Sequence, residues 1–302
     1  MKAPETADKK ELASKQIRSV TNLSLIINLA LMAAKFVIGL LSGSAAVVSD
    51  AIHSLSDMIT DLAVIFGVHF GSKKPDTEHP YGHGRIETFS GAFVAVALVT
   101  VGLGMIYYAA RDITRGKIVV PNTAMFAVTI GSIIFKEWLY QITKRVAIRS
   151  HSPAAYANAW HHRSDALSSV AVLIGIVSLK LGFKYGDEVA AIAVGLMVVF
   201  VGINIIGDCL HELTERAVDE QTIERIKSII NADSSIRQWH ELRSRTVGRE
   251  VFLDLHILVD PGLNIATAHE IAETLEKAVH EQISRPVNII VHVEPDLPDL
   301  RR

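Results

Sequence analysis

Long apolar runs separated by short polar segments occupy the first 210 residues of the chain. A helix needs about 20 predominantly apolar residues to cross the hydrocarbon core of a bilayer. Six runs are long enough to predict spanning helices, although Lys136 and Glu137 interrupt the fourth run and several polar residues lie in the second and fifth. The predicted spans are Val20–Leu41, Ser44–Phe70, Phe89–Ala110, Ala124–Tyr140, Pro153–Leu181 and Val189–Leu210.

After residue 212 the pattern changes to shorter amphipathic and alternating elements. The segment 250–259 alternates apolar residues with a mixed set, which is typical of a strand, and Gly248 lies at the predicted hairpin turn before it. The order αββαβ predicts a small α+β domain of the ferredoxin or metallochaperone type, in which two helices cover one face of three strands. Its predicted elements are the helix Asp219–Ala232, the strands Trp239–Val247 and Glu250–Val259, the helix Asn264–Ile283 and the strand Val287–Glu294.

The predicted fold class is therefore a membrane protein with an all-α domain of six transmembrane helices and a C-terminal α+β domain. We expect an N-terminal tail at 1–17, a transmembrane domain at 18–212 and a C-terminal domain at 213–302. The segment before the first span and the loops after the second and fourth spans hold eleven Lys and Arg residues, and the other loops with the adjoining helix ends hold five. The positive-inside rule then places both termini in the cytoplasm, in a protein integral to the inner or plasma membrane of the cell.

The composition limits the partners, the metal ligands and the classes of activity that this chain can have. The chain is 49% hydrophobic and 21% charged with a net charge of −2, which gives no sign of a nucleic-acid partner. Cys209 is the single cysteine, so any metal must be bound by His, Asp and Glu. The sequence has neither a phosphate-binding P-loop nor the HExxH pattern of zinc proteases, so ATP-driven pumping and that class of protease are not indicated.

Two of the predicted spans each carry a histidine followed four residues later by an aspartate: His53/Asp57 and His161/Asp165. A spacing of four places both side chains on one helix face, about one turn apart. Ionisable groups inside a bilayer are costly and normally face a partner or a water-filled path. Two imidazoles and two carboxylates brought together would form a tetrahedral site of the kind that Zn²⁺ prefers.

A purely structural interpretation of these residues also exists. Asp50 and Asp61 lie on the same stripe of the second span as the first pair. In the structural interpretation this stripe packs against other helices, and its polar groups are paired with Lys35, with Lys136 or with one another. The second pair could sit at a helix end near the membrane interface. The repetition of the same HxxxD unit favours the metal-site interpretation.

The loop after the second span contains Asp76, His79 and His83, at spacings of three and four. One carboxylate and two imidazoles on a short loop are able to bind a divalent cation. A solvated polar loop without a metal is the alternative.

The C-terminal domain is rich in histidine. His292 and Glu294 are two residues apart on one predicted strand and therefore share a face of the sheet. Histidines of neighbouring strands can join them, which would give a metal-binding cluster across the sheet, whereas isolated surface positions are the alternative for each residue. The residues concerned are His240, His256, His269, His292 and Glu294.

Taken together, these motifs resemble the cation diffusion facilitator family of proton-coupled zinc exporters. The resemblance covers residues 18 to 295. It rests on SDAIHSLSD in the second span, DTEHPYGHGRIE in the following loop, HHRSD in the fifth span and IIVHVEP in the last strand. It implies a homodimer with six transmembrane helices and a cytoplasmic metallochaperone-like domain.

The resemblance also implies roles for the residues. His53, Asp57, His161 and Asp165 would form a zinc-selective transport site, and Asp76, His79 and His83 a second site. His240, His256, His292 and Glu294, with His269 near them, would form a third site that binds zinc as a structural or regulatory ion. Glu294 stands where the family pattern has aspartate.

The expected activity is efflux of a divalent cation, most simply Zn²⁺, in exchange for protons by alternating access in the bilayer. Metal ligands must be deprotonated, and histidine titrates near pH 6.5, so metal and protons compete at one site in the physiological range. We do not expect an enzyme. Two alternatives use the same residues. The first is an intramembrane metalloenzyme, but a catalytic zinc site usually keeps one coordination position open, and four protein ligands would fill it. The second is a metal sensor without transport activity.

Overall fold

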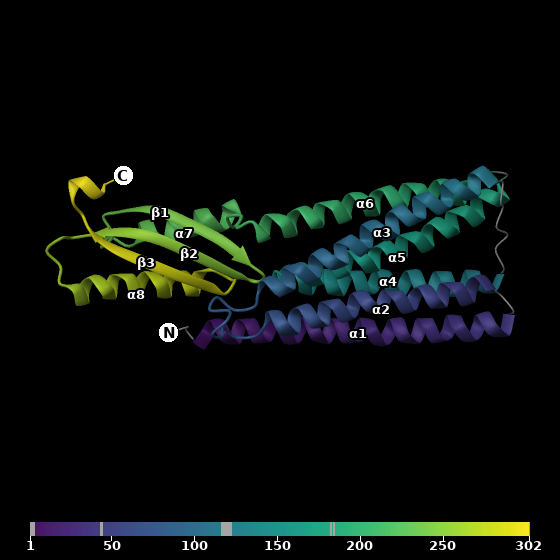
Figure 1. The fold of residues 1–302 in the computed structure, drawn as a ribbon, viewed down its shortest axis with the longest axis horizontal. Coiled ribbons are helices and arrows are strands. Elements are labelled where there is room, and N and C mark those ends of the chain that lie inside the picture. Colours follow the sequence, from purple (N-terminus) through teal and green to yellow (C-terminus); the bar gives the residue numbers. More distant parts are fainter. Residues whose placement is uncertain (1–3, 43–44, 116–122, 182, 184, 302) are drawn as a thin grey trace. The chain divides into compact units, whose positions relative to one another are not determined.

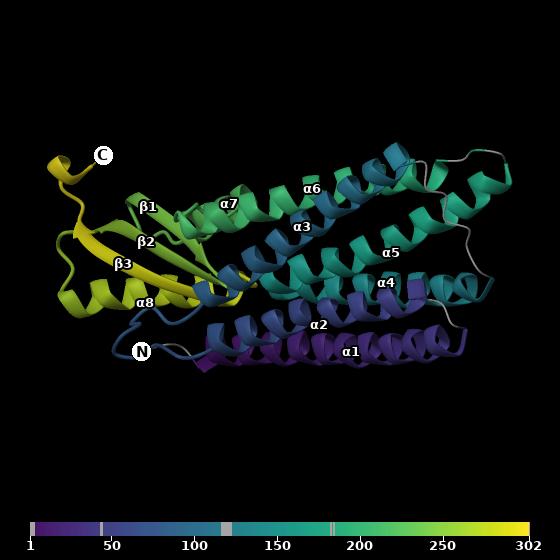
Figure 2. The ribbon, with the colours of Figure 1, turned by 45° about the vertical axis from the view of Figure 1, so that its right-hand side comes forward.

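The computed structural model describes residues 4–42, 45–115, 123–181, 183 and 185–301. Two compact units are distinguished, residues 14–210 and residues 1–13 together with 211–302. Figure 1 shows the elements with their labels, and Figure 2 shows them turned by 45°.

Six long helices form the first unit, as the sequence predicts. The first, third, fourth and sixth helices extend beyond their predicted spans at both ends, whereas the second and fifth differ from theirs by at most one residue at each end. The first helix begins at Pro4 and not at Val20, and proline is well suited to the first turn of a helix. The helices are α1 (Pro4–Ser42), α2 (Ala45–Gly71), α3 (Arg85–Arg115), α4 (Thr123–Ser150), α5 (Pro153–Lys180) and α6 (Gly186–Leu213).

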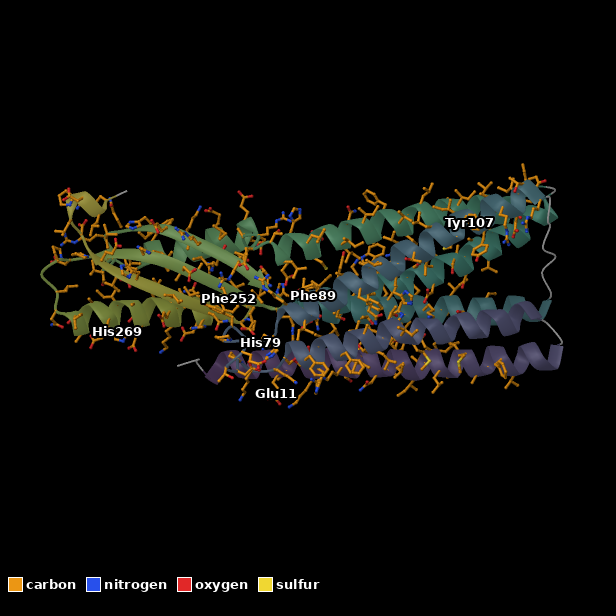
Figure 3. All side chains as sticks on the ribbon, viewed as in Figure 1. Glu11, His79, Phe89, Tyr107, Phe252 and His269 are labelled. Carbon is orange, nitrogen blue, oxygen red and sulfur yellow. The ribbon has the colours of Figure 1, made fainter. Side chains whose placement is uncertain are left out.

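The outer surface of this unit is apolar. Phe89 and Tyr107 of α3, labelled in Figure 3, are about 60% exposed. Within the described residues, three segments are long and apolar enough to cross a membrane: Glu11–Ala34, Arg85–Arg115 and Glu188–Leu213. An apolar exterior around a partly polar interior is the arrangement expected of a bundle surrounded by lipid.

Close approach of α3 and α6 depends on glycine. A Cβ atom added at Gly102 would lie 2.9 Å from the carbonyl oxygen of Gly195, and one at Gly195 would lie 2.9 Å from the carbonyl oxygen of Gly102. Small residues allow membrane helices to pack with their backbones in contact. α5 packs against α2, α3 and α4, so its side chains are placed in the interior of the unit.

The C-terminal domain has the predicted order αββαβ. Strands β1 (Gln238–Val247) and β2 (Glu250–Val259) are antiparallel, and the crossover through α8 (Ile265–Gln282) makes β3 (Val287–Pro295) parallel to β2. Gly248 has a positive φ of 59° at the hairpin turn, where glycine is free of strain.

One face of the central strand supplies the core of this domain. Leu253, Leu255 and Ile257 of β2 are at most 1% exposed and belong to one cluster with apolar residues of α7 (Glu220–Ala232) and α8. Both helices begin at side-chain caps, since Asp219 accepts a hydrogen bond from Thr222 N and Asn264 from Thr267 N. Because apolar residues occupy one face, the alternate residues of β2, His256 among them, lie on the other face.

Candidate metal centres

The second HxxxD pair lies inside the helical unit. His161 is 3% exposed, and its Nε2 is 3.8 Å from Oδ2 of Asp165 on the same face of α5. That distance is too long for a hydrogen bond. The helix α2 passes through His53 and Asp57 as predicted, but the side chains of both residues lie outside the described residues. The joining of the two pairs into one four-ligand site therefore stays a prediction.

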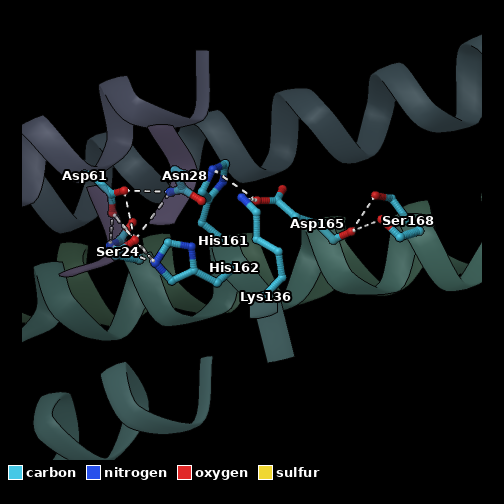
Figure 4. Close-up of polar contacts among 10 residues, drawn as sticks. Ser24, Asn28, Asp61, Lys136, His161, His162, Asp165 and Ser168 are labelled. Atoms are coloured by element: carbon cyan, nitrogen blue, oxygen red, sulfur yellow. Dashed lines mark hydrogen bonds and ion pairs between the residues drawn. The ribbon is translucent and has the colours of Figure 1, made fainter. Parts of the chain in front are cut away.

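Lys136 of α4 is the second component of this centre. Its Nζ donates a hydrogen bond of 2.7 Å to Oδ2 of Asp165, and the lysine is only 3% exposed (Figure 4). The sequence marked Lys136 only as an interruption of an apolar run and as one possible partner for acidic groups. A cation that binds Asp165 through this oxygen must displace the ammonium group.

The loop residues Asp76, His79 and His83 come together as one group, with ligand atoms within 4.8 Å of one another. Nδ1 of His79 lies 3.2 Å from one carboxylate oxygen of Asp76, and Nε2 of His83 lies 3.3 Å from the other. The backbone N–H of His79, which donates to the carboxylate at 2.7 Å, holds the pKa of Asp76 below its usual range. The carboxylate is therefore ionised and ready to bind a cation at neutral pH.

In the C-terminal domain, strand register brings three histidines into one row. His240 of β1 is opposite His256 of β2, and His256 is in turn opposite His292 of β3. Glu294 accepts a hydrogen bond of 2.9 Å from Nδ1 of His256, and its other oxygen is 3.4 Å from Nε2 of His240. His240, His256 and Glu294 have ligand atoms within 4.8 Å of one another, a donor set that suits a divalent metal.

The remaining predicted residues of this domain are placed less centrally. His292 is largely exposed, and its Nε2 lies 3.5 Å from Glu294. His269 is on α8, where its Nε2 is 3.4 Å from Glu273, and it lines a pocket together with Glu294. His269 is not a member of the three-residue group.

Glu241 is a candidate ligand that the sequence analysis missed. The pairing of β1 with β2 shifts between His240 and Arg243, and Glu241 has a positive φ of 50° at this irregularity. Its carboxylate is placed 3.8 Å from Nε2 of His256 as a result. An alternating strand pattern assigns Glu241 to the opposite face from His240, so only the bulge reveals the contact.

Two family models match nearly the whole chain. The model described as the cation efflux transmembrane domain matches residues 22–214, and the cytoplasmic domain of cation efflux proteins matches residues 218–296. A membrane unit with buried His and Asp side chains and a histidine-lined α+β domain is the architecture of a metal-cation transporter. The chain belongs to the cation efflux family, also called the cation diffusion facilitators, whose members are transporters and not enzymes.

Several curated proteins are similar to most of this chain. Metal tolerance protein C1 of Arabidopsis thaliana is 32% identical over 91% of this chain, which spans 62% of that protein. Magnetosome protein MamB of Magnetospira sp. (strain QH-2) is 34% identical, with coverage of 89% of this chain and 92% of MamB. Manganese efflux system protein MneP of Bacillus subtilis (strain 168) is 31% identical, with coverage of 92% and 96%.

Among solved structures, the metal-bound C-terminal domain of the CzcD transporter from Thermotoga maritima is 24% identical. The match covers 25% of this chain and 87% of that domain, with a TM-score of 0.24.

Proposed function

We propose that this protein is a homodimeric exporter that moves Zn²⁺ out of the cytoplasm in exchange for protons. The observation that carries the proposal is the pair His161 and Asp165, enclosed in the membrane unit of a cation efflux protein. His53 and Asp57 complete the site from α2. Two nitrogen and two carboxylate ligands form a closed tetrahedral set for Zn²⁺.

Proton exchange follows from the chemistry of these ligands. An imidazole or carboxylate binds a metal only after it loses its proton, so each ligand that binds Zn²⁺ releases any proton it held. A site that opens to the cytoplasm takes up Zn²⁺, then opens to the other side and exchanges the cation for protons. The proton gradient drives the cycle, and no nucleotide is needed.

The proposed orientation has both termini in the cytoplasm, where the C-terminal domain is in contact with the metal to be exported. The loop group of Asp76, His79 and His83 is on the same side in this topology. We propose that this group and the cluster of the C-terminal domain bind Zn²⁺ as structural or regulatory ions.

Manganese is the second candidate cargo. The similar protein of Bacillus subtilis is named a manganese efflux system protein. Purified protein in proteoliposomes with an imposed pH gradient tests both cations: Zn²⁺ flux should exceed Mn²⁺ flux and collapse when the gradient is dissipated. Absence of any cation flux would favour a sensor that binds metal without transport.

The choice of metal at His53, the first proposed ligand of the transport site, provides a separate prediction. His53→Asp replaces a nitrogen ligand by a carboxylate, and ligand type is one of the means by which proteins select metals. We expect the ratio of Cd²⁺ to Zn²⁺ flux to rise severalfold in the same vesicles. An unchanged ratio would argue that His53 does not contact the transported ion.

We expect zinc binding at the C-terminal cluster to stabilise the dimer. Among the described residues, three of one protomer form the compact group and Glu241 lies 3.8 Å from His256. A second protomer can supply further ligands, and a metal ion that joins two protomers stabilises their dimer by mass action. Residues 213–302 expressed alone should be soluble, and zinc should shorten the distance between spin labels on two protomers. His256→Ala should remove the response, whereas His280→Ala, a histidine outside the group, should keep it. A fragment that is monomeric with and without zinc would count against a regulatory site.

A further inference from the structure

A second group of polar side chains is buried in the membrane unit beside the His161/Asp165 pair. It is built on Asp61 of α2, which is 0% exposed. Figure 4 shows this group next to the contact of Lys136 with Asp165. Its other members are Ser24 and Asn28 of α1 and Asn158 and His162 of α5, each at most 1% exposed.

The polar atoms of this group are close together. Asn158 Nδ2 and Asn28 Nδ2 donate to the two carboxylate oxygens of Asp61 at 2.7 and 2.8 Å. Ser24 Oγ is 2.9 Å from Asp61 Oδ2 and also 2.9 Å from Nε2 of His162. The imidazole Nε2 is 3.7 Å from Asp61. The contacts of 2.7 to 2.9 Å are hydrogen bonds, so the two amides and the hydroxyl form one compact group with the carboxylate.

The charge of Asp61 is the first sign that this group has a function. Among the described side chains no Lys or Arg forms an ion pair with Asp61, whereas Asp165 is paired with Lys136. A carboxylate inside a bilayer is costly and normally marks a site where a cation or proton is handled. Hydrogen bonds from one hydroxyl and two amides reduce this cost without neutralising the charge.

The two asparagines provide the second sign. Oδ1 of Asn28 and Oδ1 of Asn158 are buried and have no hydrogen-bond partner in the described part of the chain. A buried acceptor without a partner costs free energy. The oxygen and nitrogen of an amide have nearly the same shape, and a half-turn of the side chain exchanges them. After that turn both amides present oxygen to the centre of the group, an orientation that a cation between them and the carboxylate would favour.

We propose that Asp61, Asn28, Asn158, Ser24 and His162 form a second binding site for a divalent cation in the membrane unit. The ligands are four oxygen-bearing groups and one imidazole. Carboxylate, carbonyl and hydroxyl oxygens suit Mn²⁺ better than Zn²⁺, and one imidazole is compatible with Mn²⁺. The affinity for Mn²⁺ relative to Zn²⁺ is therefore higher at this site than at a site of two histidines and two aspartates.

The position of this site suits a role in the entry of the cation from the cytoplasm. Asp61 is one helical turn beyond Asp57 on α2, and Asn158 and His162 flank His161 on α5. The group lies toward the end of the bundle at which α2 ends and α5 begins, the cytoplasmic end in the proposed topology. A cation that enters from the cytoplasm meets Asp61 before Asp165. This role in entry rests on the proposed function, whereas cation binding at Asp61 does not.

Manganese binding to the full-length protein in nanodiscs tests the site directly, because Mn²⁺ is paramagnetic. The background variant carries Asp57→Ala, Asp165→Ala, Asp76→Ala and Glu294→Ala, which removes two ligands from the proposed transport site and one ligand each from the loop group and the C-terminal cluster. We expect this variant to retain one Mn²⁺ per protomer, with the electron paramagnetic resonance coupling of one imidazole nitrogen. Asp61→Asn should lower the affinity at least about tenfold, and His162→Gln should remove the nitrogen coupling.

The matched control is Asn22→Leu, an exposed asparagine of α1, compared with Asn28→Leu. Only Asn28→Leu should weaken Mn²⁺ binding. If the background variant does not fold, the same substitutions in the natural chain are compared by the number of Mn²⁺ ions bound, which Asp61→Asn should lower by one per protomer. The proposal is overturned if folded Asp61→Asn protein binds as much Mn²⁺ as its parent, or if the nitrogen coupling survives His162→Gln. If the natural protein binds Mn²⁺ at Asp61 but transports no cation in proteoliposomes, the proposed function alone is overturned.

Discussion

Replacing Asp165 by asparagine is expected to reduce metal efflux to the level of vesicles without protein. The change keeps the shape of the side chain but removes a charged ligand from a proposed site of four ligands. It also leaves the ammonium of Lys136, 2.7 Å away, without its counter-charge. Asp57→Ala should have the same effect, because it removes the corresponding ligand from α2. Zinc flux into inverted vesicles, measured with a fluorescent indicator, provides the test.

A matched control separates this loss from general damage to a membrane helix. Asp112, near the end of α3, is paired with Arg111 at 3.6 Å and is not part of a candidate site. Asp112→Asn should therefore transport at close to the natural rate. Size-exclusion chromatography must show that both proteins are folded and have the same oligomeric state. Natural efflux by folded Asp165→Asn protein would place the transport site elsewhere.

The membrane helices were predictable because a bilayer imposes their length and polarity. Six apolar runs predicted six helices, and even the run interrupted by Lys136 and Glu137 is helical from Thr123 to Ser150. The helix ends were less predictable, because the apolar run marks only the part of a helix that needs lipid. Residues beyond it, such as Pro4 to Ser19 in α1, continue the helix through their own propensity.

The cluster of the C-terminal domain was partly predictable for a related reason. Alternation along β2 indicates which residues share a face with His256. It does not give the register between strands, and that register decides that His240 and His292 lie on either side of His256. Glu241 was not predicted as a ligand because a bulge reverses the face on which a strand residue lies.

The interior of the membrane unit was the least predictable part. The sequence identified Asp61 as an extra acid, but its partners come from helices whose packing a sequence pattern does not give. Two signals were present: Ser24 and Asn28 are four residues apart in an apolar run, and so are Asn158 and His162. That spacing places each polar pair on one helix face, and such a face in a membrane span indicates a buried partner.

Lys136 leads to the second large expected effect. Its ammonium lies where a cation bound to Asp165 would have to come, and two like charges about 4 Å apart repel each other by about 4 kcal/mol at an effective dielectric constant of 20. Lys136→Met removes this positive charge and keeps much of the side-chain volume. We expect the affinity of the transport site for Zn²⁺ to rise at least about tenfold, which corresponds to about 1.4 kcal/mol. Release should slow in proportion, so that maximal efflux falls while binding becomes tighter.

The same substitution should also change how metal affects stability. Removing one partner of a buried ion pair leaves the other charge uncompensated, which costs about 3–5 kcal/mol. Metal-free Lys136→Met protein should therefore unfold at a lower temperature than the natural protein, and Zn²⁺ should restore its stability. Lys144→Met, eight residues further along α4 where the lysine contacts Tyr140 Oη at 3.0 Å, is the matched control and should show neither effect. Unchanged or weaker zinc binding in Lys136→Met would mean that the lysine supports the helix packing and does not compete with the transported cation. Tighter binding with slower efflux would identify the lysine as the group that the cation displaces on entry and that returns to Asp165 when the cation leaves.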